Sequence, residues 1–276
     1  MRVSSSPALQ PLEPSATELV LDLLVTHPDQ ALSVQSLARA AEVMGIATPS
    51  IRVALTRLLQ QGRIEKAERG RYALRVGGNP LQYEVEHWLD KERRLKPWTR
   101  GWILVHGADA RLDRTSAKHH AHALQLQGFR ALASQLWARP DNLADGIEAM
   151  RQTLLRLGLA PESAVFRGQE FDEAATRRMM DLWDVAAIRA GYAQARQALA
   201  RSTARIEGMP LPQAACETLL LGRTVIRSIV RDPLLPEEML PSAERRALLH
   251  AMRHYQDNAK RLWLRVLAEP ALALAA

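Results

Sequence analysis

The segment from Thr48 to Arg75 constrains what this chain can fold into more than any other part of the sequence. Thr48 is a good N-cap residue and Pro49 suits a first helical turn, so they predict a helix over about 49–61, which Gly62 ends. Apolar residues at helical spacing predict its buried face: Ile51, Ala54, Leu55, Leu58 and Leu59. The opposite face carries the remaining side chains: Arg52, Val53, Thr56, Arg57 and Gln60.

Two short strand patterns follow this helix. Residues 63–66 and 71–74 flank a turn that contains Gly70, which is typical of a β-hairpin. Upstream, Ser15 and Glu18 have the spacing of a capping box, and Ser33 opens a second helix that ends at Gly45. Three helices and a hairpin predict a winged helix over residues 15–76, after a flexible leader at 1–14.

Basic residues gather in the same segment. The whole chain has 37 Lys and Arg against 30 Asp and Glu, a net charge of +7. Residues 50–75 alone hold seven basic and two acidic side chains. A concentrated positive charge favours a polyanionic partner, because neutralised phosphates release counterions. We therefore expect this segment to bind nucleic acid.

The remainder of the chain predicts two further domains. After a break at Gly77, a linker helix is expected within 77–97. Strand and helix patterns then follow in the order β-α-β-β-α-β at 102–106, 116–127, 129–138 (a hairpin), 142–157 and 164–167, which predicts a ferredoxin-like domain over 98–171. Residues 172–276 predict a helical domain, with one helix running from Met179 to Tyr192 and others over 212–230 and 242–267. The expected fold class is mainly α with α+β parts.

Several local phrases resemble the PaaX-like regulators, the phenylacetic acid degradation repressor family. The most specific is RSIVRDPLLPEEMLP at residues 227–241. Others are Leu182-Trp183-Asp184, the pair Trp98 and Trp102, Gly128-Phe129, and the pattern of the helix at 50–58. The resemblance covers about residues 15–267.

This resemblance implies a homodimeric transcriptional repressor that binds double-stranded operator DNA of an aromatic-acid catabolic operon. It implies a central domain similar to the Cas2 fold and an aryl-CoA effector such as phenylacetyl-CoA. A single cysteine, Cys216, points to a reducing compartment. No run of about 18 apolar residues predicts a membrane span, and the first 14 residues do not read as a secretory signal. We expect a cytoplasmic protein that is not an enzyme, without cofactor, catalytic residue or metal.

The DNA contacts follow from the winged-helix prediction. Arginine pairs with guanine edges in the major groove, and threonine contacts a phosphate or a thymine methyl group. Exposed amides at the helix start favour phosphate, and wing cations add affinity more than sequence choice. The predicted contacts on the helix are Thr48, Pro49, Ser50, Arg52, Val53, Thr56, Arg57 and Gln60. On the wing they are Lys66, Arg69 and Arg71.

The sequence also predicts an effector site toward the C-terminus. Arg223, Arg227 and Arg231 share one helix face at four-residue spacing and suit the phosphates of a thioester, while Trp183 suits its aromatic part. Salt bridges with a second protomer account for these arginines equally well.

The sequence is also compatible with two alternative functions. A metal-dependent nuclease would use Asp109 or Asp113 near the first central strand, although aspartates in a loop are usually turn formers. A constitutive DNA-binding protein would ignore small molecules. His119 and His122 are three residues apart, but the lack of a carboxylate or cysteine at ligand spacing favours a solvent-facing cluster with His120.

Overall fold

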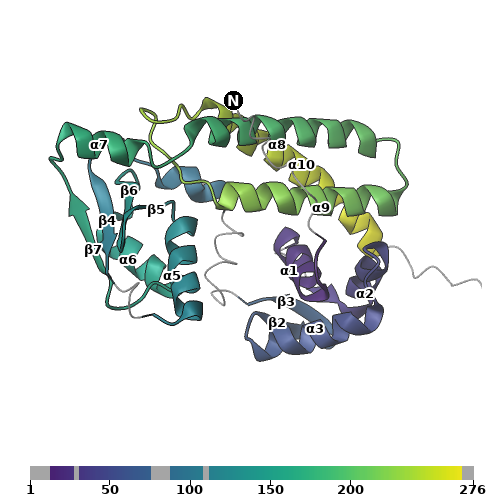
Figure 1. Ribbon diagram of the computed structural model, residues 1–276. Helices are drawn as coiled ribbons and strands as arrows, with labels where there is room; N and C mark the ends of the chain where they lie inside the picture. Colours follow the sequence, from purple (N-terminus) through teal and green to yellow (C-terminus); the bar gives the residue numbers. More distant parts are fainter. Residues whose placement is uncertain (1–12, 28–30, 76–87, 108–111, 269–276) are drawn as a thin grey trace, which may run out of the picture. The chain divides into compact units, whose positions relative to one another are not determined.

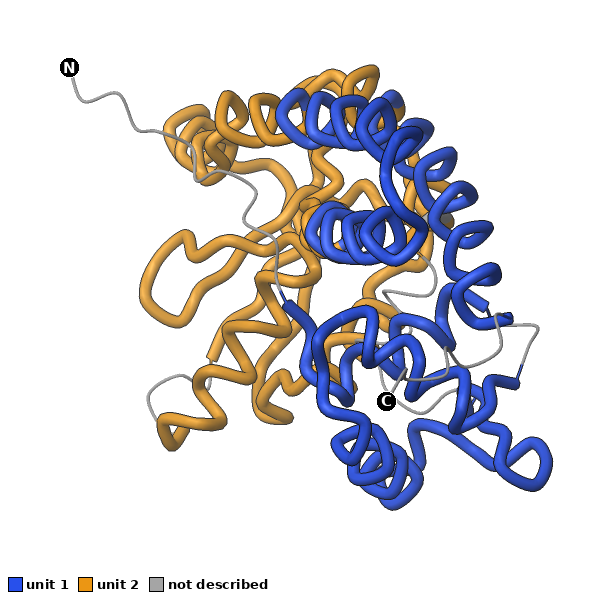
Figure 2. Tube along the Cα trace, turned by 90° about the vertical axis from the view of Figure 1, so that its right-hand side faces the viewer, with its two compact units in different colours: residues 1–79, 193–226, 247–276 blue, residues 80–192, 227–246 orange. Residues whose placement is uncertain are grey.

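The computed structural model describes residues 13–27, 31–75, 88–107 and 112–268. The chain packs into two compact units, which Figure 2 distinguishes by colour. Unit 1 comprises 1–79, 193–226 and 247–276, and unit 2 comprises 80–192 and 227–246. The long helices α8 (Val185–Ile206), α9 (Leu211–Val230) and α10 (Ala243–Ala268) each give residues to both units. Within the described residues, no helix is both long and apolar enough to cross a membrane.

Unit 1 begins with the helices α1 (Ala16–Thr26), α2 (Val34–Val43) and α3 (Thr48–Gln60), labelled in Figure 1. Ser15 and Glu18 form the predicted capping box, in which Glu18 Oε2 accepts from the Ser15 amide at 2.9 Å. The prediction that Thr48 is the N-cap of α3 was wrong. Thr48 is the first helical residue, Ala47 precedes it as N-cap, and no side-chain hydrogen bond caps this end.

A three-stranded antiparallel sheet in the order β1-β3-β2 follows these helices. Strands β2 (Ile64–Glu68) and β3 (Arg71–Leu74) form the predicted hairpin, with Gly70 at a φ of +74° in the turn. That left-handed conformation suits glycine because it has no Cβ. Strand β1 (Leu32–Ser33) adds to β3 and was not predicted, because two residues are too few to show an alternating pattern.

One apolar core joins these N-terminal helices to the C-terminal ones within unit 1. Leu19, Leu37 and Leu58 are fully buried in it. The helices α9 and α10 contribute Ala215, Leu219, Trp263, Val266 and Leu267. The Arg39 guanidinium also donates to the carbonyl of Leu267 at 3.0 Å, at the end of α10. The three N-terminal helices therefore depend on residues about 200 positions away for part of their core.

Unit 2 contains a four-stranded antiparallel sheet in the order β5-β6-β4-β7. The strands are β4 (Trp102–His106), β5 (Arg130–Ala133), β6 (Leu136–Pro140) and β7 (Ala164–Gly168). The alternate β4 residues Ile103 and Val105 share a core with Leu124 of α5 (Arg114–Leu126) and Leu154 of α6 (Gly146–Leu157). Both helices thus cover one face of the sheet, since side chains alternate along a strand.

The 227–241 segment packs into this same unit. Leu234 belongs to the core of the sheet and helices, and its carbonyl accepts from Asn142 Nδ2 at 2.6 Å. Asp232 is buried, where it accepts from the Tyr192 hydroxyl at 2.5 Å and from the Leu234 amide at 2.7 Å. Every buried polar group named here is satisfied, so the segment is a structural part of unit 2.

Several predicted boundaries were wrong for identifiable reasons. The single helix expected from Met179 to Tyr192 is two, α7 (Glu173–Met180) and α8, because Asp184 caps a new helix by accepting from the Ala187 amide at 2.8 Å. Helix α6 begins at Gly146 rather than 142, since the Asn142 side chain bonds elsewhere. Residues Trp88–Arg94 form a 3₁₀ helix, η1, and positions 81–87 of the expected linker helix lie outside the described residues, as does most of the leader.

Candidate nucleic-acid interface

Helix α3 has one face in the core and one in solvent. Ile51 and Leu58 are fully buried. The predicted contact residues on the other face are all exposed: Arg52, Val53, Thr56, Arg57 and Gln60. Val53 is 69% exposed, which is unusual for a large apolar side chain. The Thr56 hydroxyl donates to the Arg52 carbonyl at 3.0 Å, one turn back.

The N-terminal turn of α3 is only partly accessible to a phosphate. Pro49 and Ser50 are exposed, and Thr48 is half-buried. The Ser50 amide already donates to the Ala47 carbonyl at 2.9 Å, in the tight first turn. A phosphate at this end would therefore meet the side chain of Ser50 more readily than its amide.

The hairpin presents cations of two kinds. Lys66 and Arg69 are exposed near its turn. Arg71 is exposed too, but its guanidinium donates to the Ala31 carbonyl at 2.5 Å. Arg63 is half-buried, and burial lowers the pKa of its guanidinium. Lys66 and Arg69 are thus exposed hairpin cations that differ from Arg71, which is bonded to a carbonyl, and from Arg63, which is half-buried.

Sequence patterns offered Arg223 as an effector residue and did not reveal that it contacts α1. Arg223 of α9 forms ion pairs with Asp22 and, at 3.0 Å, with Glu18, both on α1. Glu18 is partly buried, which raises its pKa, but hydrogen bonds from Ser15 and the charge of Arg223 outweigh burial and lower the pKa overall. The partners are about 200 residues apart, so no local spacing could have revealed them.

The four residues considered for an effector do not belong to one unit. Arg223 lies in unit 1, whereas Trp183, Arg227 and Arg231 lie in unit 2. Arg227 and Arg231 are exposed. Trp183 is 4% exposed, and its ring stacks on that of Trp102 at 6.2 Å between centroids.

The histidines and aspartates considered as metal ligands or nuclease residues occupy different environments. His119 and His122 are exposed, as predicted. The prediction was wrong for His120, which is buried and whose Nδ1 accepts from the Ala160 amide at 3.2 Å. Asp113 caps α5, and hydrogen bonds from Ser116 and Thr115 lower its pKa. Asp109 lies outside the described residues. Across the described part of the chain, no three His, Cys, Asp or Glu side chains gather as metal ligands.

Comparison with known proteins places this surface in context. The chain is 30% identical over 244 residues to Transcriptional repressor PaaX of Escherichia coli (strain K12), spanning 83% of this chain and 75% of that protein. Residues 15–75 match the profile of the family described as PaaX-like protein. Uncharacterized protein Rv0674 from Mycobacterium tuberculosis shares the fold, with a TM-score of 0.63, 19% identity, and coverage of 91% of this chain and 98% of that one. The chain carrying the exposed basic face of α3 therefore belongs to the PaaX-like family.

Proposed function

We propose that this protein is a cytoplasmic, DNA-binding transcriptional repressor of an aromatic-acid catabolic operon of the phenylacetate type, and not an enzyme. The observation that carries the proposal is the two-sided helix α3, which exposes Arg52, Val53, Thr56 and Arg57 opposite a fully buried apolar face. The similarity to a protein named as a transcriptional repressor supports the same conclusion.

In this proposal residues 15–76 act as a winged helix. Helix α3 would enter the major groove, where Arg52 and Arg57 pair with guanine edges and Val53 contacts a thymine methyl group. Thr48, Pro49, Ser50, Thr56 and Gln60 would position the helix, and Lys66, Arg69 and Arg71 would contact the backbone. Because Arg71 already bonds to the Ala31 carbonyl, we assign it the smallest share.

The remaining architecture is also part of the proposal. The strand order β5-β6-β4-β7 with two helices on one face supports a ferredoxin-like, Cas2-like domain over 98–171, followed by a helical domain over 172–276. Residues 77–97 would link it to the winged helix. A homodimer suits a two-fold operator.

Repression would be relieved by an aryl-CoA thioester such as phenylacetyl-CoA. A ligand shifts the protein away from DNA only if it prefers the arrangement that does not bind DNA. Participation of Arg223, Arg227, Arg231 and Trp183 in that step stays a prediction.

The test is a fluorescence anisotropy titration of the full chain against DNA from upstream of its own gene. Scrambled DNA is titrated in parallel at about 150 mM salt, close to physiological ionic strength, with and without phenylacetyl-CoA. We expect selective binding that the thioester releases. Selective binding that the thioester does not change would retain the repressor and reject this effector. Equal affinity for both DNAs would reject the proposed function.

A further inference from the structure

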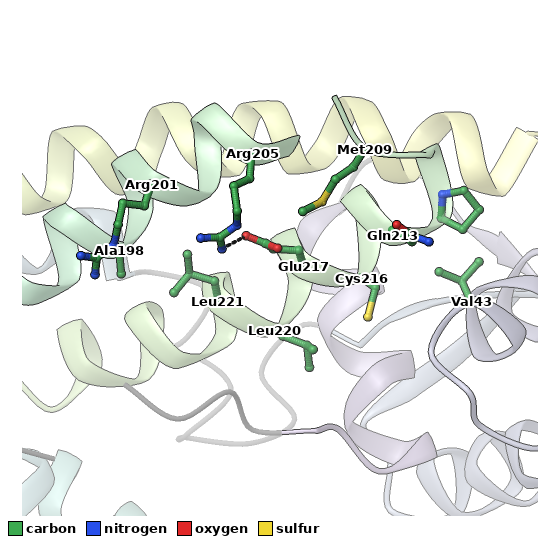
Figure 3. Close-up of a pocket in the computed structure, with 11 residues that line it drawn as sticks. Val43, Ala198, Arg201, Arg205, Met209, Gln213, Cys216, Glu217, Leu220 and Leu221 are labelled. Carbon is green, nitrogen blue, oxygen red and sulfur yellow. Dashed lines mark hydrogen bonds and ion pairs between the residues drawn. The ribbon is translucent and has the colours of Figure 1, made fainter. Parts of the chain in front are cut away.

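A pocket opens in unit 1 beside the N-terminal helices. Its volume is about 590 Å³, and residues of α8, α9 and the turn between them line it, together with Val43 at the end of α2 (Figure 3). This volume falls within the range of small-molecule sites, which is roughly 300–1,000 Å³. None of the four residues considered above for an effector lines it.

Most of the wall is apolar. Val43, Met209, Leu220 and Leu221 contribute to it, and so does the thiol of Cys216. Burial, together with the charges of Glu13 and Glu217, raises the pKa of this thiol. A neutral thiol among aliphatic side chains suits an apolar group and not a second anion.

The polar lining carries one cation in excess. Figure 3 shows the guanidinium of Arg205 pointing toward the carboxylate of Glu217, and the two form an ion pair. Glu217 also accepts from the Ser202 hydroxyl at 2.6 Å, so its charge is compensated. Arg201, one turn before Arg205 on α8, lines the pocket without an ion pair to any described residue. An arginine in this position suits a carboxylate or phosphate.

We propose that this pocket binds an organic anion with an aromatic or aliphatic body. The anionic group would pair with Arg201, and the body would lie over Leu220 and Leu221 toward Cys216. A free arylacetic acid supplies the anion as its carboxylate. In its coenzyme A thioester the acyl carbonyl is uncharged, so only the phosphates of the nucleotide part supply an anion. The nucleotide part of a thioester would extend outside a pocket of this size.

The position of Val43 gives the pocket a regulatory role, which rests on the proposed function. Val43 belongs to α2, whose Leu37 and Ala41 share a core with Ile51 of α3. The affinity of a ligand that contacts both Val43 and α9 therefore depends on how α2 packs on α9. Binding there and DNA binding are then coupled reciprocally.

Cys216 supplies a direct readout, because it is the only cysteine in the chain. We would measure its alkylation rate by a maleimide in the full-length protein, with phenylacetate, phenylacetyl-CoA or free coenzyme A added. We expect phenylacetate or the thioester to slow alkylation in a saturable manner, and free coenzyme A to have no effect. Which of the two protects identifies the source of the anion.

Matched variants test the role of arginine. Arg201→Ala should raise the half-protecting concentration about tenfold or more, as expected for the loss of a charge-assisted hydrogen bond. Arg201→Lys should restore part of the affinity. Arg196→Ala is the control, since Arg196 is an exposed residue of the same helix that does not line the pocket.

The inference is overturned if none of the compounds slows alkylation, or if Arg201→Ala and Arg196→Ala behave alike. A parallel DNA titration without ligand keeps this result separate from the proposed function. Sequence-selective DNA binding with no protection of Cys216 would reject the pocket alone. Protection without selective DNA binding would reject the repressor and leave the ligand site in place.

Discussion

At the scale of single residues, the arginines of this chain have different tasks that their surroundings define. Arg52 and Arg57 are exposed on α3. Arg71 is exposed but bonded to the Ala31 carbonyl. Arg223 is largely buried and holds two carboxylates of α1. A guanidinium whose donors are already used contributes less to a new ligand, which ranks the residues for mutation.

Arg57→Ala should weaken binding to the cognate operator by about 1–3 kcal/mol and relax base preference at one position, because one bidentate contact to guanine is lost. Anisotropy titrations with single-base operator variants measure both effects. Arg253→Ala, at an exposed position of α10, is the control and should leave affinity unchanged. An equal loss on cognate and scrambled DNA would mean that Arg57 contacts only phosphate.

Ser15→Ala should lower the free energy of unfolding by about 0.5–2 kcal/mol near neutral pH, because it removes the capping box of α1. The folded state lowers the pKa of Glu18, so this stabilisation is present above the ordinary glutamate pKa and is lost as pH falls through the folded value. Urea titrations at several pH values should show the wild type and the variant converging in acid. Ser134→Ala, in an exposed turn, should match the wild type throughout.

At the scale of elements, close approach explains why particular segments meet. Gly128 ends α5 at a φ of +80°, and a Cβ added there would lie 2.8 Å from the Pro233 carbonyl oxygen. The 227–241 segment can therefore reach the core of unit 2 only because position 128 has no side chain. Gly128-Phe129 and Asp232-Pro233 are separate motifs in the sequence, but in the structure Gly128 packs directly against Pro233.

Gly128→Ala should destabilise the protein clearly more than Gly146→Ala. Gly146 has nearly the same φ, +79°, but nothing lies within 4 Å of an added Cβ. Both variants bear the left-handed strain of about 1–3 kcal/mol, and only Gly128→Ala adds the clash with Pro233. Equal losses of thermal stability in the two variants would show that this contact is not a constraint.

Sequence patterns predicted the elements with strong periodicity and failed where tertiary contacts decide. The two faces of α3 and the hairpin after it follow from spacing alone, and both were found. The break before α8 was missed, since apolar residues such as Leu182 and Trp183 continue the helical pattern across it. The pocket residues could not be predicted either, because Val43 and Arg201 line the same pocket only through the packing of unit 1.

At the scale of the whole molecule, the N-terminal helices are stabilised by the far end of the chain. Trp263 of α10 is 1% exposed in their core, with Val266 and Leu267 beside it. Helix α3 carries the exposed basic face, and the core that supports it includes residues of α9 and α10. If α3 binds DNA as proposed, stability and DNA binding depend on the same contacts.

Trp263→Ala should cost about 3–5 kcal/mol of stability, as other large-to-small core changes do. It should also reduce DNA affinity, although no residue of the basic face changes. Trp263→Phe keeps most of the ring and should retain most of both properties. Unaltered stability in Trp263→Ala would show that α10 does not support the N-terminal helices.

The net charge of +7 predicts a strong salt dependence of DNA binding. With six to ten phosphate contacts, affinity should fall by about 10³–10⁵ between roughly 50 and 200 mM salt. Lys66→Ala should reduce the slope of log K against log salt by about 1 without changing sequence preference. A slope that Lys66→Ala leaves unaltered would place this hairpin residue away from the DNA.

The shared core of unit 1 also matters while the protein is being made. Residues 15–75 leave the ribosome before α10, and Trp263 and its neighbours, which complete their core, emerge some 190 residues later. Until then the earliest helices expose apolar surface that can associate wrongly, as partly folded chains do. A chain whose synthesis stops short of α10 carries every residue of the basic face but lacks the support that holds it. Under the proposed function, competence to bind DNA is thus acquired only once α10 has emerged, which keeps shorter nascent chains from occupying operators.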